Sequence, residues 1–394
     1  MTQVLSGIRV LDFGRYISAP WCAAVLADLG ADVIRVERRD GGEDRWMTPL
    51  GESGDGAMFL QCNRNKRSLS LDPTTLEGAE IKNRLIATAD IVIVNLPEPA
   101  LKSLGLDYAS LKAIKPDIIL ANGTAYGLGG PYSERVDYDG IGQVMSGAIY
   151  RSGTPEAPMR AAVPYVDWGT ALALATGTLA AVIHRNNTGE GQQIEGSLLA
   201  TALMMSNGMV MEQAVLKPDR IAIGNRGHAG APSDLFRVKD GWVLVQIVGP
   251  PQFKRWCRMI GEDHWLSDPR FSNDGLRGAN QAVLNDRMAE WCITRTKDEA
   301  LAALDAARIP ASPLYSPQEA LDDVHIRQMG YYKTVDYPGL PTPAPIMETP
   351  FRMSATPGSI RSRAPTIGEH TDEILASLGY DTASVAALRD GQVV

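Results

Sequence analysis

Short apolar runs alternate with amphipathic segments along the first part of the chain. The first run, at residues 8–13, is followed by a segment at 18–29 with a helical stripe of apolar residues, and then by a second run at 31–37. The runs predict strands and the amphipathic segment predicts a helix. This strand–helix–strand opening favours a parallel sheet, because parallel strands are joined by crossover connections.

The same alternation continues beyond the first three elements. Apolar runs at 65–72, 91–95 and 118–121 predict three more strands, and helical patterns lie between them at 77–89 and 100–114. Repeated strand–helix alternation is typical of α/β proteins. We therefore expect an α/β fold whose large domain contains a Rossmann-like parallel sheet.

The longest uncharged stretch runs from Trp168 to Ile183. A helix that is apolar around its whole circumference is expected to be buried. The interior Thr and Gly residues, and a length short of a bilayer span, favour a core helix of a soluble protein. Asp167 comes directly before this stretch, where aspartate is among the preferred N-cap residues. The position of Asp167 alone therefore favours a structural role.

The second half of the chain is organised differently. A Met- and Leu-rich segment at 197–213 predicts a core helix, and the composition changes near residue 217. A strand pattern at 242–247 and three helical patterns after it predict a second, smaller domain.

These patterns give an expected domain organisation. Residues 1–200 form a large domain, 201–224 a linker and 225–325 a smaller α/β domain. The segment 330–394 is rich in proline and is expected to return to the large domain and complete it.

Composition excludes several classes of function. The net charge of -8 is spread along the chain without a basic block, so neither nucleic-acid binding nor a polybasic membrane anchor is expected. The cysteines and histidines are scattered without metal-ligand spacing, so no metal site is expected. The cysteine usage suits a reducing compartment, and the first residues lack the features of a signal peptide. We expect a cytoplasmic protein.

Two short segments are candidates for ligand binding. The turn at 14–18 follows the first predicted strand, and ligands of open α/β sheets bind at the carboxyl ends of strands. The turn lacks the GxGxxG pattern, which argues against a nicotinamide or flavin dinucleotide. Arg38 and Arg39 close the second predicted strand. They are either solvated charges or phosphate ligands, because guanidinium groups bind phosphate in a bidentate manner.

Six features of the chain together resemble family III CoA-transferases, the CaiB–BaiF family, which includes formyl-CoA transferase, carnitine CoA-transferase and a racemase branch. They are the N-terminal segments 5–12 and 26–37, followed by 65–68, 104–106, 188–192, 240–242 and 368–375. The resemblance extends from residue 5 to about residue 380, so it covers nearly the whole chain.

The resemblance implies a fold and a CoA site. Two domains would be joined by extended connections, and two subunits would thread through each other as an interlocked homodimer. The large domain would bind CoA or acyl-CoA as a substrate, with no tightly bound cofactor. By position, the CoA contacts would be Tyr16, Arg38, Leu71, Asn95, Leu96 and Leu104.

The resemblance also implies a reaction. Asp167 aligns with the family's nucleophile, which attacks an acyl-CoA thioester to give an aspartyl mixed anhydride and then an aspartyl-CoA thioester. CoA would finally pass to an acceptor carboxylic acid. The start of a helix is expected to keep Asp167 ionised and to offer N–H groups to developing negative charge. Asp139 is expected either to assist this reaction or to be a solvated surface acid.

A glycine-rich segment resembles a loop that closes over the family's active site. It contains Gly224, Gly227, His228 and Gly230, and its alternative interpretation is an inter-domain hinge. His228 is also a candidate for holding the acceptor carboxylate, as are Arg15 and Arg226. The acids themselves remain open, and succinate or another small dicarboxylate with a medium-sized acid is a plausible pair.

The chain departs from the family pattern at several positions. Segment 95–99 does not match the motif that many relatives carry there. Positions 103 and 136 are Ser and Val in this chain, where relatives often or sometimes have a basic residue. The CoA phosphates are therefore expected at Arg38, Arg39 or Lys66. The racemase branch uses a His–Asp pair where this chain has Tyr138-Asp139, which disfavours proton abstraction. An α-methylacyl-CoA racemase or epimerase is the alternative function, and a catalytically silent CoA-binding protein is a third.

Overall fold

The computed structural model describes residues 3–52 and 54–394, which divide into two compact units. The large unit comprises Met1–Ala148, Ala161–Lys217 and Met329–Val394, and the small unit comprises Ile149–Arg160 and Pro218–Gln328. The returning C-terminal segment therefore belongs to the large unit. The expected boundaries differ from these in two respects. Ile149–Arg160 lies within the expected large domain but is part of the small unit, and the expected linker 201–224 is divided, with 201–217 in the large unit and 218–224 in the small unit.

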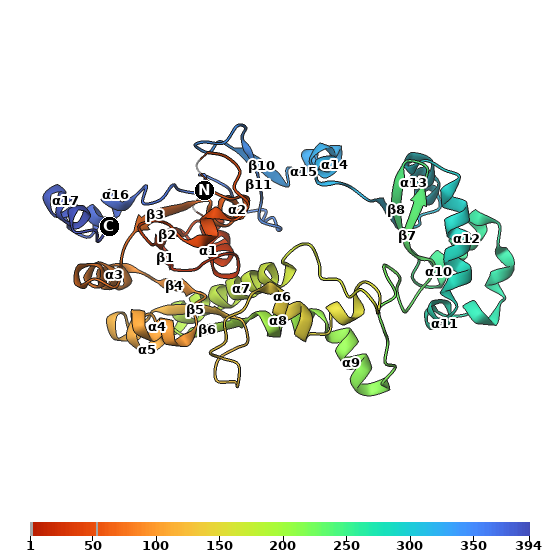
Figure 1. Cartoon of the computed structure of the whole chain (residues 1–394), viewed down its shortest axis with the longest axis horizontal. Helices are drawn as coiled ribbons and strands as arrows, with labels where there is room; N and C mark the ends of the chain where they lie inside the picture. Colours follow the sequence, from red (N-terminus) through yellow and green to blue (C-terminus); the bar gives the residue numbers. More distant parts are fainter. Residues whose placement is uncertain (1–2, 53) are drawn as a thin grey trace. The chain divides into compact units, whose positions relative to one another are not determined.

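A six-stranded parallel sheet forms the centre of the large unit (Figure 1). Its order is β3-β2-β1-β4-β5-β6, which is the doubly wound order of a Rossmann-like sheet. The strands are β1 (Arg9–Asp12), β2 (Asp32–Glu37), β3 (Lys66–Ser70), β4 (Ile91–Val94), β5 (Ile119–Thr124) and β6 (Gln193–Ser197). The predicted α/β class is confirmed. The chain reverses direction across the sheet between β1 and β4, so a crevice is expected at their carboxyl ends.

Helices cover both faces of this sheet. On one face, alternate residues of the strands pack against α1 (Ser18–Asp28) and α7 (Tyr165–Thr188). On the other face, the strands pack against five helices: α3 (Leu76–Thr88), α4 (Glu98–Leu104), α5 (Tyr108–Ile114), α16 (Thr371–Ser377) and α17 (Thr382–Asp390). Because α16 and α17 supply part of the second face, the returning segment is an integral part of the core.

The long helix α7 is only partly as predicted. Val166, Thr170 and Leu174 begin its buried stripe, but Ile183 is exposed. The prediction that α7 is buried all round is therefore wrong for this chain. By length and composition α7 is also long enough to cross a membrane, although the uncharged run alone suggested otherwise. Its packing against α1, β5 and β6 gives the helix a place in the core.

Buried hydrogen bonds, two of them made by the ion-paired side chains of Arg45 and Asp55, connect the returning segment to the rest of the large unit. Arg45 donates to Glu37 at 2.7 Å and to the carbonyl oxygen of Pro365 at 3.1 Å. Tyr337 donates to Asp55 at 2.6 Å. The returning segment also carries a hairpin of β10 (Tyr332–Val335) and β11 (Ala344–Met347). These contacts lie on the large unit, as does the short helix α2 (Ala57–Asn63).

The Met-rich region was predicted to form one core helix at 197–213, and residues 201–224 were expected to be a linker. The structure instead has two helices here, α8 (Leu198–Met205) and α9 (Asn207–Leu216), which occupy most of the expected linker. Met204 and Met211 are exposed and no residue of α9 is buried. The predicted core helix is therefore wrong, because apolar composition alone does not tell which surface a helix packs on.

The small unit has its own core. Its three strands, β7 (Ser233–Val238), β8 (Gly241–Gln246) and β9 (Ala311–Pro313), form an antiparallel sheet. Its helices are η2 (Ile149–Arg151), α10 (Pro250–Ile260), η3 (Asp263–Leu266), η4 (Pro269–Phe271), α11 (Asp274–Ala279), α12 (Gln281–Ile293), α13 (Lys297–Ala306) and α14 (Pro317–Asp322). The following α15 (Val324–Met329) leads into the large unit. Aromatic residues dominate this core, with Trp256 and Trp265 stacked at 5.5 Å.

Candidate active site

The turn after β1 is held in an unusual conformation. Tyr16 has a positive φ of 62°, which is uncommon for a residue with a bulky side chain and often marks a functional site. Asn95, at the end of β4, binds the same turn on two sides. Its Oδ1 accepts from the N–H of Arg15 at 2.8 Å, and its Nδ2 donates to the Arg15 carbonyl at 2.7 Å. The side-chain amide thus fixes the turn at the point where the chain reverses across the sheet.

Two cavities lie at this carboxyl edge of the sheet. The larger has a volume of about 360 Å³ and the smaller about 80 Å³. Arg15 and Leu96 line both, so the two cavities adjoin. Together they offer an elongated site that runs from β2 and β3, past β1 and β4, to the start of α7.

The predicted CoA contacts are distributed over the two cavities. Tyr16 and Asn95 line the larger one, Arg38, Leu71 and Leu104 line the smaller one, and Leu96 lines both. These six positions are far apart in the sequence but meet at one edge of the sheet. Their contact with CoA remains a prediction.

Two of the three expected phosphate ligands do not lie in this site. Arg39 is exposed and lines neither cavity. The Lys66 ammonium is fully buried and donates to Asp12 at 2.6 Å and to the Pro20 carbonyl at 2.8 Å. Lys66 is therefore a structural cation, and its assignment to phosphate was wrong. Arg38 is exposed and lines the smaller cavity.

Asp167 lines the larger cavity from the first turn of α7. It is the third residue of the helix and does not cap it. Asp139, the first residue of α6 (Asp139–Met145), supplies the cap instead, accepting the N–H groups of Val166 at 2.8 Å and Asp167 at 3.0 Å. The N-cap interpretation of Asp167 is therefore wrong. Asp139 is buried, so its interpretation as a solvated surface acid is wrong as well.

The first turn of α7 has no N–H group free for a substrate. Beyond the two bonds to Asp139, the N–H of Tyr165 donates to the Val163 carbonyl and that of Trp168 donates to the Pro164 carbonyl. The expected stabilisation of negative charge by these N–H groups is therefore wrong. Sequence alone could not reveal this, because the acceptor belongs to another helix.

The electrostatic environment of Asp167 opposes ionisation. Burial of the carboxyl group, and secondly the negative charge of Asp139, raise the pKa of Asp167 to about 7. We expected the helix to keep Asp167 ionised, whereas the raised pKa favours the protonated carboxyl group. Because Asp139 satisfies the helix terminus and carries a negative charge, it offsets the favourable helix dipole.

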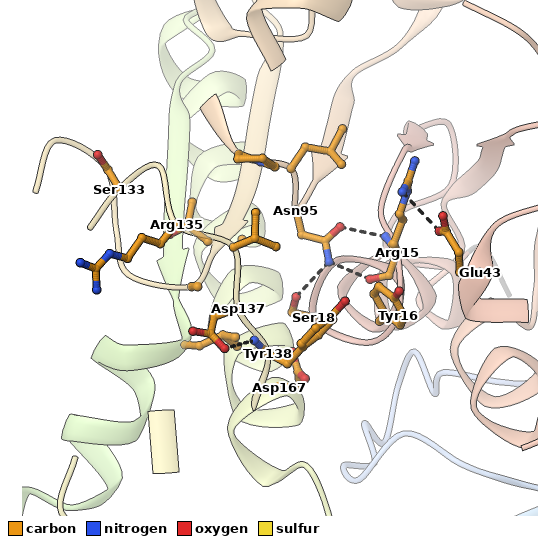
Figure 2. Close-up of a pocket in the computed structure, with 17 residues that line it drawn as sticks. Arg15, Tyr16, Ser18, Glu43, Asn95, Ser133, Arg135, Asp137, Tyr138 and Asp167 are labelled. Carbon is orange, nitrogen blue, oxygen red and sulfur yellow. Dashed lines mark hydrogen bonds and ion pairs between the residues drawn. The ribbon is translucent and has the colours of Figure 1, made fainter. Parts of the chain in front are cut away.

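Two tyrosines lie beside one another in the larger cavity (Figure 2). The rings of Tyr16 and Tyr138 meet edge to face, with 5.5 Å between centroids. A side-chain hydrogen bond with Tyr138, together with burial, raises the pKa of Tyr16 to about 12. Tyr138 occupies the position of the racemase histidine, and no histidine lines this cavity as the structure describes it.

Several cavity residues were not identified from the sequence. Glu43, Ser133, Arg135 and Asp137 line the larger cavity from loops without a motif. Figure 2 shows the guanidinium group of Arg135 pointing away from the tyrosine pair, and the side chain of Glu43 pointing toward Arg15. These segments carry glycines but match no ligand-binding motif, so the sequence gave no signal for a site there.

The glycine-rich segment belongs to the small unit. Gly224 donates to the Gly153 carbonyl at 2.7 Å, and Gly230 donates to the Asp274 carbonyl at 2.9 Å. His228 Nε2 lies 3.0 Å from the Ile221 carbonyl. Both ends of the segment are thus tied within the unit. Closure of this segment over the site, including any role of Gly227, stays a prediction, as does acceptor binding by Arg226.

No metal centre is apparent in the part of the chain that the structure describes. Residues 3–52 and 54–394 contain no cluster of three or more His, Cys, Asp or Glu side chains able to hold a metal ion.

Comparisons with known proteins are consistent across sequence and structure. The model of CoA-transferase family III matches residues 5–371. The chain is 33% identical over 382 residues to succinate–glutarate CoA-transferase of Agrobacterium fabrum, with 95% of each protein covered. It is 32% identical to formyl-CoA:oxalate CoA-transferase of Rhodopseudomonas palustris, covering 99% of this chain and 97% of the relative.

A solved structure shows the same fold. The crystal structure of a CaiB/BaiF family protein from Brucella suis superposes with a TM-score of 0.84 at 33% identity, covering 96% of this chain and 100% of the other. The similarity therefore extends over both units.

Proposed function

The chain belongs to CoA-transferase family III and is an enzyme of the transferase class, and from that premise we propose how it transfers CoA. In our proposal, Asp167 forms a covalent intermediate between an acyl-CoA and an acceptor carboxylic acid. The observation that carries this proposal is that the Asp167 carboxyl lines a cavity of about 360 Å³ which adjoins a second cavity through Arg15 and Leu96. A long, narrow ligand such as acyl-CoA fits such a site.

The proposed reaction proceeds by acyl exchange at Asp167. One carboxylate oxygen attacks the thioester carbonyl carbon, the C–S bond breaks, and CoA leaves as a thiolate. The thiolate then attacks the aspartyl carbonyl of the mixed anhydride and releases the first acid as its carboxylate. The acceptor carboxylate attacks the carbonyl carbon of the aspartyl-CoA thioester and expels CoA thiolate, which gives a second mixed anhydride. The thiolate then attacks the acceptor's acyl carbonyl carbon, so that the new acyl-CoA forms and the Asp167 carboxylate is released. Each difficult exchange is thereby divided into easier steps.

The environment of Asp167 supports this role. Burial and Asp139 disfavour the ionised carboxylate, so the nucleophile is more basic than an ordinary aspartate. Acylation removes the negative charge, and the repulsion from Asp139 disappears with it. We therefore propose that Asp139 assists catalysis by holding the start of α7 and by making the ionised ground state of Asp167 less stable than its acylated form.

We propose a small dicarboxylate such as succinate as one acid of the exchange. The relatives support this choice, because their names include succinate–glutarate CoA-transferase and succinyl-CoA–L-malate CoA-transferase, the latter from Chloroflexus aurantiacus. The second acid is a medium-sized carboxylic acid. The reaction needs acyl-CoA only as substrate, and we propose no tightly bound cofactor.

The decisive experiment detects the covalent intermediate. Purified protein is incubated with succinyl-CoA and a panel of other acyl-CoAs, quenched with hydroxylamine and digested, and the peptide containing position 167 is analysed by mass spectrometry. We expect an aspartyl hydroxamate at Asp167 and CoA exchange with at least one acid. The variant Asp167→Asn is the control and should show neither. If wild type and variant both lack exchange with every acid tested, the proposal fails.

A racemase or epimerase is the second candidate function, favoured by one observation. A pKa of about 7 would suit Asp167 as a general acid–base group. The partner group is unidentified, since no described cavity residue is a histidine; Tyr138 is one candidate among the cavity residues. Deuterium uptake from solvent at the α-carbon of a 2-methylacyl-CoA, without CoA exchange, would favour this candidate over the transferase.

We further propose that the protein is an interlocked homodimer in the cytoplasm. Exposed apolar residues on α6, α8 and α9 support a partner surface; they are Val144, Met145, Leu203, Met204, Met205, Val210, Met211, Val215 and Leu216. A second copy would bury them. Light scattering coupled to gel filtration should give twice the 42.5 kDa chain mass, and a monomer would contradict the proposal. The four buried free cysteines suit a reducing compartment.

A further inference from the structure

We propose that Arg15 and Arg38 form a clamp for the diphosphate of CoA, and that Glu43 occupies this clamp as an internal competing anion when no ligand is bound. The inference rests on the proposed function insofar as the ligand is CoA. It gives Arg15 a role in nucleotide binding instead of acceptor binding, and it identifies Glu43 as a residue that sets CoA affinity.

The clamp is visible in the contacts of one carboxylate. Oε2 of Glu43 lies 3.3 Å from Nη1 of Arg15, and Oε1 lies 3.8 Å from Nη1 of Arg38. Each oxygen thus faces a different guanidinium group. Arg15 follows β1, Arg38 follows β2, and Glu43 begins the short helix η1 (Glu43–Trp46). Two guanidinium groups that face one small anion are the arrangement expected of a phosphate site.

The clamp lies where the two cavities adjoin. Arg15 lines both cavities, Arg38 lines the smaller and Glu43 lines the larger. Asp167 is in the larger cavity, so the thioester end of an acyl-CoA belongs there. The nucleotide end then belongs in the smaller cavity, which is lined by Leu71 and Leu104. The diphosphate connects these two ends of CoA, so it must pass the junction at Arg15, the residue that is paired with Glu43.

Other cations near the smaller cavity are not free to bind a ligand. Arg35 also lines it, but this side chain is buried and is paired with Asp44 at 2.9 Å and Glu37 at 3.3 Å. By contrast, the side chains of Arg15 and Glu43 are 41% and 56% exposed. Exposed ion pairs contribute little to folding. A diphosphate, with more charge than one carboxylate, can therefore displace Glu43 at small cost.

The backbone of Arg15 is held in place, while its side chain can exchange Glu43 for another anion. The two hydrogen bonds from Asn95 hold the Arg15 peptide, as Figure 2 shows. Arg38 keeps a second partner, Asp40, at 3.1 and 2.8 Å. Displacement of Glu43 would thus leave both arginines positioned, and ligand affinity would depend on how strongly Glu43 competes.

Binding measurements on the full-length protein test this inference. Calorimetric titration with free CoA is compared among wild type, Glu43→Gln, Arg15→Gln and the double variant. We expect Glu43→Gln to bind CoA about 5-fold more tightly and Arg15→Gln about 10-fold more weakly. In the double variant the gain from Glu43→Gln should shrink, because one of its two partners is gone. Glu80→Gln removes an equal charge from an exposed helical pair with Arg84 and should leave affinity unchanged.

A truncated ligand identifies the phosphate involved. With 3′-dephospho-CoA the factor lost by Arg15→Gln should be the same as with CoA. If that factor disappears, Arg15 binds the 3′-phosphate and the inference is overturned. It is also overturned if Glu43→Gln leaves CoA affinity unchanged or weaker, or if Arg15→Gln raises only the KM of the acceptor acid. Failure of wild type to bind CoA at all would instead contradict the proposed function.

Discussion

At the scale of single residues, the chemistry depends on how Asp167 is surrounded. A carboxyl group in the first turn of a helix is usually stabilised as an anion. Here Asp139 takes the helix N–H groups of Val166 and Asp167, and burial and its negative charge raise the pKa of Asp167. The pKa of Asp167, the proposed nucleophile, is therefore raised to about 7 instead of lowered.

The first prediction concerns the pH dependence of transfer. If the Asp167 carboxylate is the nucleophile, as we propose, its raised pKa of about 7 means that kcat/KM should fall about tenfold per pH unit below about pH 7. Asp139→Asn removes the negative charge that is the second cause of the raised pKa of Asp167. The pH below which kcat/KM falls, the acid limb of the profile, should therefore decrease but stay above the value for an ordinary aspartate. Asp137→Asn, also in the cavity, is the control and should leave the limb in place. Equal shifts in both variants would contradict the role of Asp139.

The second prediction concerns stability at the same residue. The folded-state pKa of Asp167 is raised from the ordinary aspartate value of 3.8 to about 7, so folding loses stability as pH rises from about 4 through 7. Asp167→Asn cannot ionise and avoids this loss. The variant should be more stable than wild type by about 4 kcal/mol at pH 8 and about equally stable at pH 4. Urea unfolding at both pH values measures this, and a variant that is less stable at pH 8 would refute it.

At the scale of elements, the start of α7 depends on a side chain from α6. Asp139 replaces the missing local cap, since Pro164 provides no side-chain hydrogen bond. This places residues 139 and 167 on neighbouring helices, with the Asp139 carboxylate bonded to the backbone N–H of Asp167. The same contact therefore positions the turn that carries Asp167 and provides an acceptor for N–H groups at the start of α7.

The third prediction separates the cap from the charge. Asp139→Ala removes both and should destabilise the protein by about 1–2 kcal/mol at pH 8, where loss of the cap is only partly offset by relief of repulsion. Asp139→Asn keeps an acceptor oxygen and should lose less. Hydrogen exchange of the Val166 and Asp167 amides should accelerate mainly in the alanine variant. If both variants exchange alike, the capping role is contradicted.

At the scale of the whole molecule, the C-terminal segment completes the large unit. Ile374 and Leu375 are fully buried in the core that covers one face of the sheet. They pack with residues from strands formed near the other end of the chain. The binding edge therefore depends on a segment almost three hundred residues away in sequence from β3.

The fourth prediction tests this closure. Leu375→Ala leaves a cavity in the core and should cost about 2–5 kcal/mol. Leu76→Ala is the matched control, because Leu76 is 88% exposed and its truncation should change stability by no more than about 0.5 kcal/mol. Thermal and urea unfolding compare the two. Equal effects would mean that the returning segment does not stabilise the large unit.

The sequence by itself determined the elements and their order. Strands such as Ile91–Val94 and helices such as Leu76–Thr88 follow from local periodicity, which a short window of residues contains. It also singled out Asp167, through a resemblance that the family model confirms as membership. It failed where burial depended on distant partners, as for the exposed α9 and the buried Lys66.

Only the tertiary structure decided the electrostatics of the site. Groups that the fold brings together produce three features of the site. Asp139 caps α7, the pKa of Asp167 is raised, and Glu43 lies between Arg15 and Arg38. Coulombic and desolvation effects depend on distance and solvent exposure. Neither quantity is written in the order of residues, so the sequence could suggest Asp167 as the nucleophile but could not reveal how its surroundings shift its pKa.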